Sequence, residues 1–296
     1  MKDVSLEMGG NVTKTRIVCD SACDLPQSEL DRLEITMVSL SIRFGDEEFL
    51  DRITLSQAEF WQRCSQSRTL PETSAPSPGA FSAAFEKAAA EGYSGVVVIA
   101  LSSLLSGTYQ SALIAARGVR DLIDVRVVDS RAVSMAQGLL AIEVAERAHE
   151  GASLDDLEIH ALTLRPRLGV IAMLDTLDHL IKGGRVGGAK ALIGQVLSIK
   201  PLLELRDGLV AEAGRQRTTS RAMASIAATA ASHAPLRRLA LIHAQSNQVD
   251  ALSELINDID VQYPPLVADM GPTVGTHGGP GLIGLTWLEA ESEFRR

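Results

Sequence analysis

Short apolar runs alternate with amphipathic segments through the first half of the chain. Three apolar runs end in turn residues and predict buried strands, at residues 16–20, 95–101 and 125–130. Three longer segments predict helices, at residues 79–92, 106–119 and 138–151. This β-α-β-α-β order predicts a parallel sheet with helices on both faces.

Residues at the ends of these segments support the assignment. Ser77 and Pro78 suit the first turn of one helix, and Ser106 is a candidate N-cap for the next. Gly151 is placed to end the third helix. Residues 35–44 alternate between apolar and polar positions, which predicts one further strand.

The second half has a different pattern. Strands are predicted at residues 169–174 and 237–245, and residues 201–214 predict a hairpin that turns at Asp207 and Gly208. Helices are predicted at residues 175–185, 188–198, 218–233 and 249–259, and residues 157–168 begin as a helix that breaks at Pro166. A hairpin within an α/β pattern predicts a mixed sheet.

These patterns predict two α/β domains, with a parallel sheet in the N-terminal one and a mixed sheet in the C-terminal one. We place the first domain at residues 15–165 and the second at residues 166–296. Residues 1–14 are polar and without periodicity, which predicts a disordered tail.

One glycine-rich segment, "GPTVGTHGGPGLIG" at residues 271–284, contains a single histidine, His277. The runs "PPLVAD" and "LTWLEA" on either side predict strands, so the segment is expected to be a turn. Because glycine in such density costs conformational entropy, a close approach of the backbone to another group is the expected reason for it.

Composition narrows the function classes. Hydrophobic residues make up 46% of the chain, which is typical of a globular protein with a core. The net charge of −9 argues against nucleic-acid binding and against attraction to anionic lipid. Cysteine occurs only at positions 19, 23 and 64, which indicates a reducing cytoplasm and does not fit a zinc site. The longest apolar runs are too short to span a bilayer.

Hydroxyl-bearing and acidic residues follow the predicted strands. Ligands of open α/β sheets bind beyond the carboxyl ends of the strands, so Thr73, Ser74 and Ser106 are candidates for binding a carboxylate or phosphate. The helix that opens near Ser106 offers unpaired N–H groups, and Gly107 would let a ligand approach them. Each of these residues alone has a simpler interpretation, as a helix cap or a loop residue.

Motifs of self-sufficient catalysis are missing. The sequence has no phosphate-binding G-x-x-x-x-G-K-[ST] loop, no H-E-x-x-H pair and no G-x-S-x-G elbow. Arg185 of "KGGR" is a candidate cation at the cleft, and Lys182 fits an exposed helix end. A nucleophile–base pair of Ser106 and His277 stays open, because the two residues can meet in space.

Seven segments, in order along nearly the whole chain, resemble the DegV family. They are "VCDSACDL", "TSAPSPGAF", "LSSLLSGTYQSA", "VVDSRAVSMAQG", "LIKGGRVGGAKA", "IKPLLELRDG" and "GTHGGPGLIG". The resemblance implies a bacterial, cytoplasmic lipid-binding protein that holds one long-chain fatty acid in a tunnel between its two α/β domains. It further implies a subunit of fatty acid kinase, acting in phospholipid metabolism. This subunit presents the carboxylate to a separate ATP-dependent kinase subunit.

The resemblance also implies roles for individual residues. The carboxylate pocket of the family corresponds to Thr73, with Ser74 beside it, and to Ser106 and Gly107. His277 matches a histidine beside the head group, and Arg185 an arginine near it. Arg217 corresponds to a surface cation for kinase docking. Family members often have glutamine where this chain has Ala75.

Three hypotheses follow. In the first, the chain binds a fatty acid for a kinase partner and is not an enzyme itself. It needs no cofactor or metal. Stable insertion into a membrane is not expected under this hypothesis, and transient membrane contact stays open. In the second, Ser106 and His277 form an acyl hydrolase or transferase. In the third, the chain is a lipid-binding sensor without a kinase role.

Overall fold

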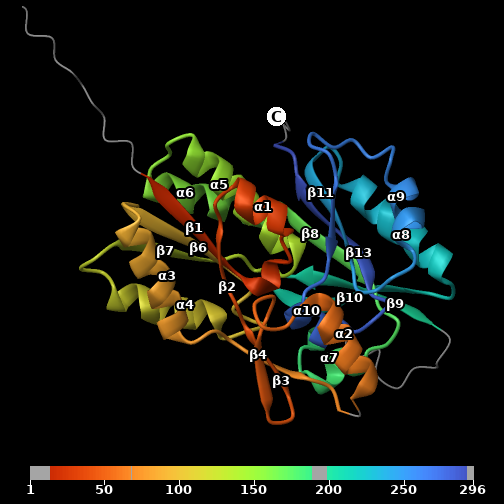
Figure 1. Cartoon of the computed structure of the whole chain (residues 1–296). Helices are drawn as coiled ribbons and strands as arrows, with labels where there is room; N and C mark the ends of the chain where they lie inside the picture. The colour runs from red at the N-terminus through yellow and green to blue at the C-terminus, as the bar shows by residue number, and fades with distance from the viewer. Residues whose placement is uncertain (1–13, 68, 189–198, 292–296) are drawn as a thin grey trace, which may run out of the picture.

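The computed structural model describes residues 14–67, 69–188 and 199–291. It contains a four-stranded sheet formed from the first half of the chain and a six-stranded sheet formed from the second (Figure 1). A small three-stranded sheet lies beside them. The first large sheet ends at Asp129 and the second begins at Leu168, so no strand is shared between them. The proposed domain boundary near residue 165 fits in this interval and stays a prediction.

The four-stranded sheet is entirely parallel. Its strands are β1 (Thr15–Asp20), β2 (Thr36–Val38), β6 (Gly95–Ala100) and β7 (Asp124–Asp129), in the order β2-β1-β6-β7. Every residue of β6 is buried, because helices cover both faces of the sheet. Val97 and Ile99 pack into one hydrophobic cluster, and Val96 and Val98 pack into another.

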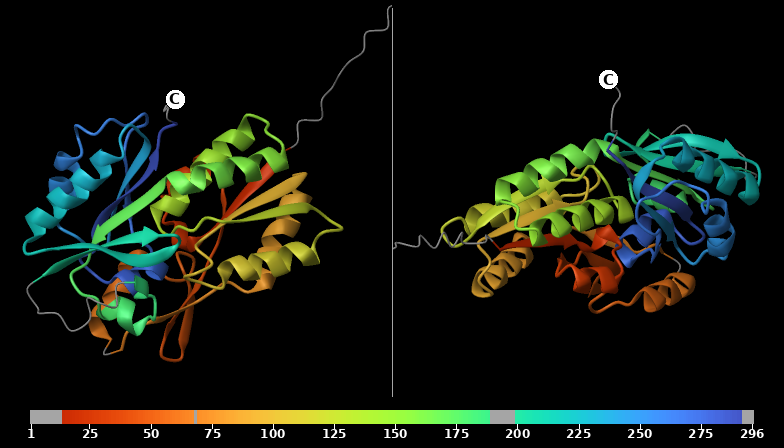
Figure 2. Two further views of the ribbon diagram at one scale, coloured as in Figure 1. Left: turned by 180° about the vertical axis from the view of Figure 1, so that it is seen from behind. Right: turned by 90° about the horizontal axis from the view of Figure 1, so that it is seen from above.

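The helices of this part divide between the two faces. Helices α3 (Pro78–Ala90) and α4 (Thr108–Gly118) cover one face, while α5 (Met135–His149) and α6 (Leu154–Leu164) cover the other. In the view from above, α5 and α6, in green, lie on one side of the sheet and α3, in orange, on the other (Figure 2). Ser77 caps α3 through its hydroxyl, as predicted. A short 3-10 turn, η2 (Arg165–Arg167), follows α6 at the predicted break.

The six-stranded sheet is mixed, as predicted. Its strands are β8 (Leu168–Met173), β9 (Lys200–Arg206), β10 (Leu209–Gln216), β11 (Leu236–His243), β12 (Leu266–Asp269) and β13 (Ile283–Glu289). Their order is β10-β9-β8-β13-β11-β12, and only β11 and β12 pair in parallel. The predicted hairpin joins β9 to β10, and Asp207 and Gly208 both have positive φ in its turn.

The helices of the second half have two different positions. Helix α8 (Thr219–Ser232) packs on one face of the six-stranded sheet, and α9 (Val249–Leu255) packs against α8 and β11. Helices α7 (Asp178–Lys182) and α10 (Pro272–Gly278) contact each other near the first half of the chain. The predicted helix at residues 188–198 lies almost wholly outside the described residues.

Residues 35–44 do not form one strand, which corrects the prediction. The chain leaves the parallel sheet after β2 and enters the small sheet at β3 (Ser41–Phe44), because the Leu40 N–H donates to the Ser21 hydroxyl instead of continuing a strand ladder. Strand β3 pairs with β4 (Glu47–Leu50) and β5 (Glu72–Ser74). The hydrophobic pattern did not predict η1 (Ser21–Cys23), α1 (Gln27–Arg32) or α2 (Gln57–Gln66).

Two further predictions about element ends are wrong. Ser106 is not the N-cap of α4, because the N–H groups of Leu105 and Ser106 bond to the Ser102 carbonyl in a separate turn and the helix begins only after Gly107. The segment at residues 271–284 is not a simple turn, because its first half forms the helix α10.

Helix α5 lies between the two large sheets. It contacts β1 and β6 of the parallel sheet and also β8, β11 and β13 of the mixed sheet. Twelve of its fifteen residues are buried, which follows from contact on both sides. One hydrophobic cluster therefore extends through this helix from Ile17 to Leu288.

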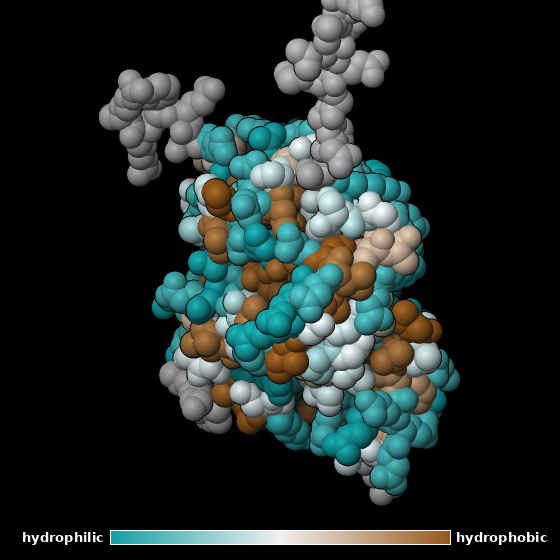
Figure 3. Space-filling model, turned by 90° about the vertical axis from the view of Figure 1, so that its left-hand side faces the viewer, coloured by the Kyte–Doolittle hydropathy of each residue, from teal (hydrophilic) through white to brown (hydrophobic). Residues whose placement is uncertain are grey.

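The surface is mixed in polarity. On the face that carries β7, α4 and α6, apolar residues are interrupted by hydrophilic ones (Figure 3). Across the described residues, every helix is too short or too polar to cross a bilayer. The described residues also contain no group of three or more histidine, cysteine or acidic side chains placed to hold a metal ion.

Candidate functional site

A cavity lies between the carboxyl ends of the parallel strands and the inner face of the mixed sheet. Segments that follow all four parallel strands contribute to it, through Leu40, Ala22, Leu101 and Val133. The cavity has a volume of about 130 Å³. The position agrees with the expectation that ligands of α/β sheets bind beyond the strand ends.

The wall of the cavity is mostly aliphatic. The mixed sheet supplies Val170, Ala172, Leu203, Leu205, Val210 and Ile242. Leu174, Leu180, Met270 and Leu282 add further apolar surface. Such a wall favours a flexible hydrocarbon chain, because each buried methylene contributes about 0.8 kcal/mol.

Four of the predicted site residues line this cavity together. Thr73 comes from β5, Ser106 from the loop before α4, Arg185 from the segment after α7, and His277 from the last turn of α10. The Thr73 Oγ1 atom lies 2.8 Å from His277 Nε2. The structure therefore brings residues that are 204 positions apart in the sequence into one polar group.

His277 is held as a neutral ring. Burial lowers the pKa of His277 to about 4, and the nearby charge of Arg185 acts in the same direction. Its Nδ1 atom has no hydrogen-bond partner among the described residues and packs against Gly183, where a β-carbon would lie 2.2 Å from it. Gly183 thus leaves the space that the imidazole ring occupies.

Arg185 stands between the cavity and a second, more polar pocket. Its Nε donates to the Leu105 carbonyl at 3.2 Å, and its Nη1 donates to the Gly183 carbonyl at 2.6 Å. The outer pocket is lined by Glu72, His179 and Lys182 and shares Thr73, Arg185 and His277 with the cavity. Thr73, Arg185 and His277 therefore lie where the cavity meets the outer pocket, and Ser106 follows Leu105, whose carbonyl Arg185 contacts.

The other predicted residues lie elsewhere. Ser74 is exposed, because successive residues of a strand point to opposite faces and Thr73 faces the cavity. Gly107 is exposed too, and the nearest atom to a β-carbon there would be Cβ of Ala75, 3.9 Å away. Arg217 is an exposed residue between β10 and α8 and lines neither pocket.

Ser134 and Thr273 line the cavity and were not identified from the sequence. Ser134 follows β7 much as Ser106 follows β6, so its position after a strand was the available signal. Thr273 lies one helical turn before His277, a relation that became visible only with α10 as a helix. Both hydroxyls donate to buried carboxylates, Ser134 to Asp24 and Thr273 to Asp51.

Ser106 and His277 do not form a nucleophile–base pair in this arrangement. The Ser106 hydroxyl lies 2.9 Å from Thr108 Oγ1, and His277 Nε2 is occupied by Thr73. No carboxylate among the described residues bonds to His277 Nδ1 to orient the ring. The residues thus provide hydrogen-bonding groups at the end of an apolar cavity, without an assembled catalytic triad.

The fold and the cavity define an α/β protein with an internal apolar cavity. The chain belongs to the DegV family, because the model of that family, described as uncharacterised, matches residues 14–290. A DegV domain-containing protein of Halalkalibacterium halodurans is 35% identical over 282 residues, which cover 93% of this chain and 99% of the relative. The DegV protein of Bacillus subtilis is 32% identical over 278 residues, or 92% of this chain and 98% of the relative.

Solved structures agree with this assignment. A DegV family protein from Thermus thermophilus, reported to bind fatty acid, superposes with a TM-score of 0.85 at 32% identity and covers 94% of this chain and 100% of its own. DegV of Bacillus subtilis, described as a fatty acid binding protein, superposes with a TM-score of 0.84 at 30% identity and the same coverage.

Proposed function

We propose that this chain binds one long-chain fatty acid in the cavity and presents its carboxylate to a separate ATP-dependent kinase subunit. The observation that carries the proposal is an apolar cavity that ends at Thr73, Ser106, Arg185 and His277 beside the surface. The two related structures described as fatty acid binding support the ligand class. The kinase role rests on the family resemblance.

The polar end suits a carboxylate because it offers hydrogen-bond donors. His277 Nε2 is paired with Thr73 Oγ1, and in the tautomer that carries the proton on Nε2 the ring is the donor of this hydrogen bond. His277 then donates to Thr73, so the Thr73 hydroxyl hydrogen is left to donate to the ligand. Ser106 supplies a second hydroxyl in the same wall.

The ligand is tested first by native mass spectrometry of the purified protein. A bound mass that matches an acid of roughly 14 to 18 carbons is expected, since each methylene adds about 0.8 kcal/mol of burial. Titration with acids of increasing length then measures the dissociation constant. Affinity should rise by up to about fourfold per methylene until the cavity is full. No bound lipid and no dependence on chain length would contradict the ligand class.

The polar end is tested by Thr73→Ala and Ser106→Ala. Each variant removes a hydroxyl that donates to a charged group, so each should weaken fatty acid binding roughly tenfold to a hundredfold. Ser28→Ala, on the exposed side of α1, is the control and should bind as the parent does. Unchanged affinity in both variants, with the fold intact by circular dichroism, would refute this carboxylate site.

The kinase role has a separate test. Radiolabelled acyl phosphate should form only when the chain, the fatty acid, ATP and a kinase subunit are all present. Binding of fatty acid without acyl phosphate formation with any cognate kinase subunit would support the sensor hypothesis instead. Hydrolysis of acyl esters that is lost in Ser106→Ala would support the hydrolase hypothesis.

A further inference from the structure

Two buried carboxylates meet the start of α10. The Gly271 N–H donates to Asp24 Oδ1 at 2.8 Å, and the Thr273 N–H donates to Asp51 Oδ2 at 3.2 Å. The Thr273 hydroxyl also donates to Asp51. Asp24 is 2% exposed and Asp51 is fully buried, and neither lines the cavity. These side chains therefore act on the backbone at the start of the helix and not on a ligand.

Both carboxylates reach α10 from the first half of the chain. Asp24 follows η1, and Asp51 follows β4, whereas α10 connects β12 to β13 of the mixed sheet. Asp24 also accepts a hydrogen bond of 2.6 Å from Ser134 Oγ in the cavity wall. One acid thus joins the ends of three segments that surround the cavity.

Ser134 itself has an unusual backbone conformation. Its φ is 56° and its ψ is −149°, a region that residues other than glycine rarely adopt. The bond to Asp24 and a backbone bond from Ser134 N–H to the Ala22 carbonyl, 2.8 Å long, maintain it. Such strain persists only where the surroundings enforce it, and it is common at ligand sites.

Burying Asp24 and Asp51 is energetically unfavourable if the two acids only cap the start of α10. Burial raises the pKa of Asp24 to about 8 and raises that of Asp51 as well. Asp51 Oδ1 has no hydrogen-bond partner among the described residues. The α-helices that have a side-chain cap, α2, α3, α6 and α8, use a serine or threonine hydroxyl for it, as Ser77 does for α3 and Thr218 for α8. The arrangement at α10 is therefore more than a helix cap requires.

The geometry of α10 links this contact to the polar end of the cavity. Thr273 and His277 are four residues apart, so they lie on the same side of the helix. Gly275, two residues after Thr273, faces α2. A β-carbon at Gly275 would lie 3.0 Å from Trp61 and 3.1 Å from Phe60 of α2. Because α10 packs this closely against α2, the position of the first turn of α10 determines the position of His277.

We propose that Asp24 and Asp51 are positioning residues that hold the first turn of α10, so that His277 meets Thr73 at the polar end of the cavity. The inference rests on the proposed fatty acid function only where the test measures affinity for a fatty acid. The position of His277 can be measured without any ligand.

The test uses Asp24→Asn and Asp51→Asn in the full chain. NMR titration of the imidazole protons measures the pKa of His277, which is about 4 in the parent structure because the ring is buried. In both variants the pKa should rise by at least one unit toward 6.5, because the ring leaves its buried place. Affinity for a fluorescent fatty acid should fall at least fivefold.

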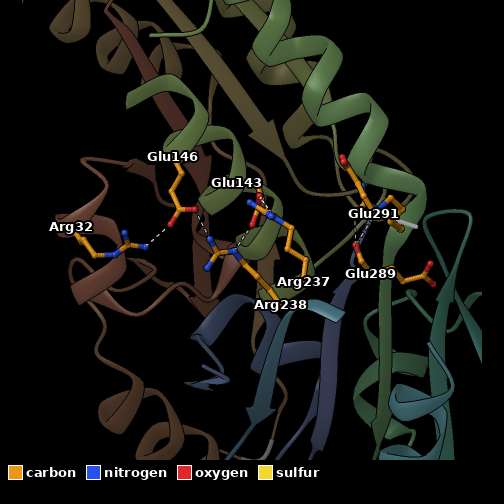
Figure 4. Close-up of polar contacts among 8 residues, drawn as sticks. Arg32, Glu143, Glu146, Arg237, Arg238, Glu289 and Glu291 are labelled. Atoms are coloured by element: carbon orange, nitrogen blue, oxygen red, sulfur yellow. Dashed lines mark hydrogen bonds and ion pairs between the residues drawn. The ribbon is translucent and has the colours of Figure 1, made fainter. Parts of the chain in front are cut away.

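Glu143→Gln is the matched control. Glu143 is another buried acid, 2% exposed, but it pairs with Arg237 and Arg238 (Figure 4) and is not in contact with α10. This variant should lower the melting temperature and leave both the pKa of His277 and the affinity unchanged. The control thereby separates a loss of folding stability from a displacement of His277.

Several outcomes would overturn the inference. They are an unchanged pKa of His277 in both acid variants, an unchanged affinity, or a change of equal size in Glu143→Gln. If an acid variant does not fold, Thr273→Val, which removes only the hydroxyl bond to Asp51, replaces it and should raise the pKa of His277 by a smaller amount. A parent protein that binds no fatty acid would refute the proposed function, while the His277 titration would still test the positioning.

Discussion

At the scale of single residues, two aspartates shape the loops around the cavity. Asp20 accepts from Ala22 N–H at 3.1 Å and from Leu101 N–H at 2.8 Å. Asp129 accepts from Arg131 N–H at 3.0 Å and from Ser103 N–H at 3.1 Å. Both residues therefore shape turns by accepting hydrogen bonds from backbone N–H groups two residues further along the chain. Each also bonds to the loop that carries Ser106, a contact that no local pattern shows.

Asp24 should make stability depend on pH. Burial raises its pKa from 3.8 to about 8, so the folded protein binds this proton more tightly than the unfolded chain does. The contribution of Asp24 to the free energy of unfolding therefore falls as pH rises from about 4 to about 8. Asp24→Asn removes this contribution, and its stability relative to the parent should improve steadily across that range.

Urea denaturation at a series of pH values measures this difference. Asp121→Asn, whose side chain is 96% exposed, serves as the control and should track the parent at every pH. A difference between Asp24→Asn and the parent that stays constant from pH 4 to pH 8 would show that Asp24 does not titrate in this range.

Among the elements, α10 shows how packing overrides local preference. Glycine disfavours helices by roughly 1 kcal/mol relative to alanine, and this short helix contains two within its span. Gly275 permits the close contact with Phe60 and Trp61 of α2. Gly279, with φ of 75°, ends the helix beside the His179 ring. The glycines therefore serve close packing and a sharp exit, in agreement with the expected close approach of the backbone.

Gly275→Ala should weaken the protein despite its better helix propensity. The new methyl group would lie within about 3 Å of two buried rings, and overpacking of this kind typically costs about 1 to 3 kcal/mol. The thermal midpoint should fall, and fatty acid affinity should fall with it because His277 lies on the same helix. Gly118→Ala in α4, where no atom lies within 4 Å of the added carbon, should be neutral or slightly stabilising. Equal midpoints in the two variants would contradict this packing argument.

At the scale of the whole molecule, a cluster of ion pairs joins the two halves of the chain. Glu143 and Glu146 on α5 accept from Arg237 and Arg238 on β11, and Arg32 of α1 reaches Glu146 (Figure 4). The Arg238 side chain is only 8% exposed. Together with the hydrophobic cluster around α5, these pairs join the mixed sheet to the parallel one, and none of the four side chains of Glu143, Glu146, Arg237 and Arg238 lines the cavity.

Arg238→Leu should therefore be strongly destabilising. Removing one member of a buried ion-pair cluster leaves carboxylates without their partner and costs about 3 to 5 kcal/mol. Arg147→Leu, which breaks an exposed pair between Arg147 of α5 and Glu150 at the C-cap of that helix, should cost less than about 1 kcal/mol. Chemical denaturation measures both, and similar losses in the two variants would refute the importance of burial here.

The sequence by itself determined the α/β class, the parallel and mixed sheets and the main helices, because these depend on hydrophobic periodicity and local turn chemistry. Residue patterns also made Thr73, Ser106, Arg185 and His277 candidates, family resemblance assigned them to one carboxylate pocket, and the structure places all four in the lining of one cavity. Only the tertiary structure decided that Ser74 and Gly107 face away, that Ser134 and Thr273 line the cavity, and that Asp24 and Asp51 bond to α10. These facts depend on contacts between residues more than 100 positions apart, and on which face of a strand or helix meets another element. Local patterns carry no information about such contacts.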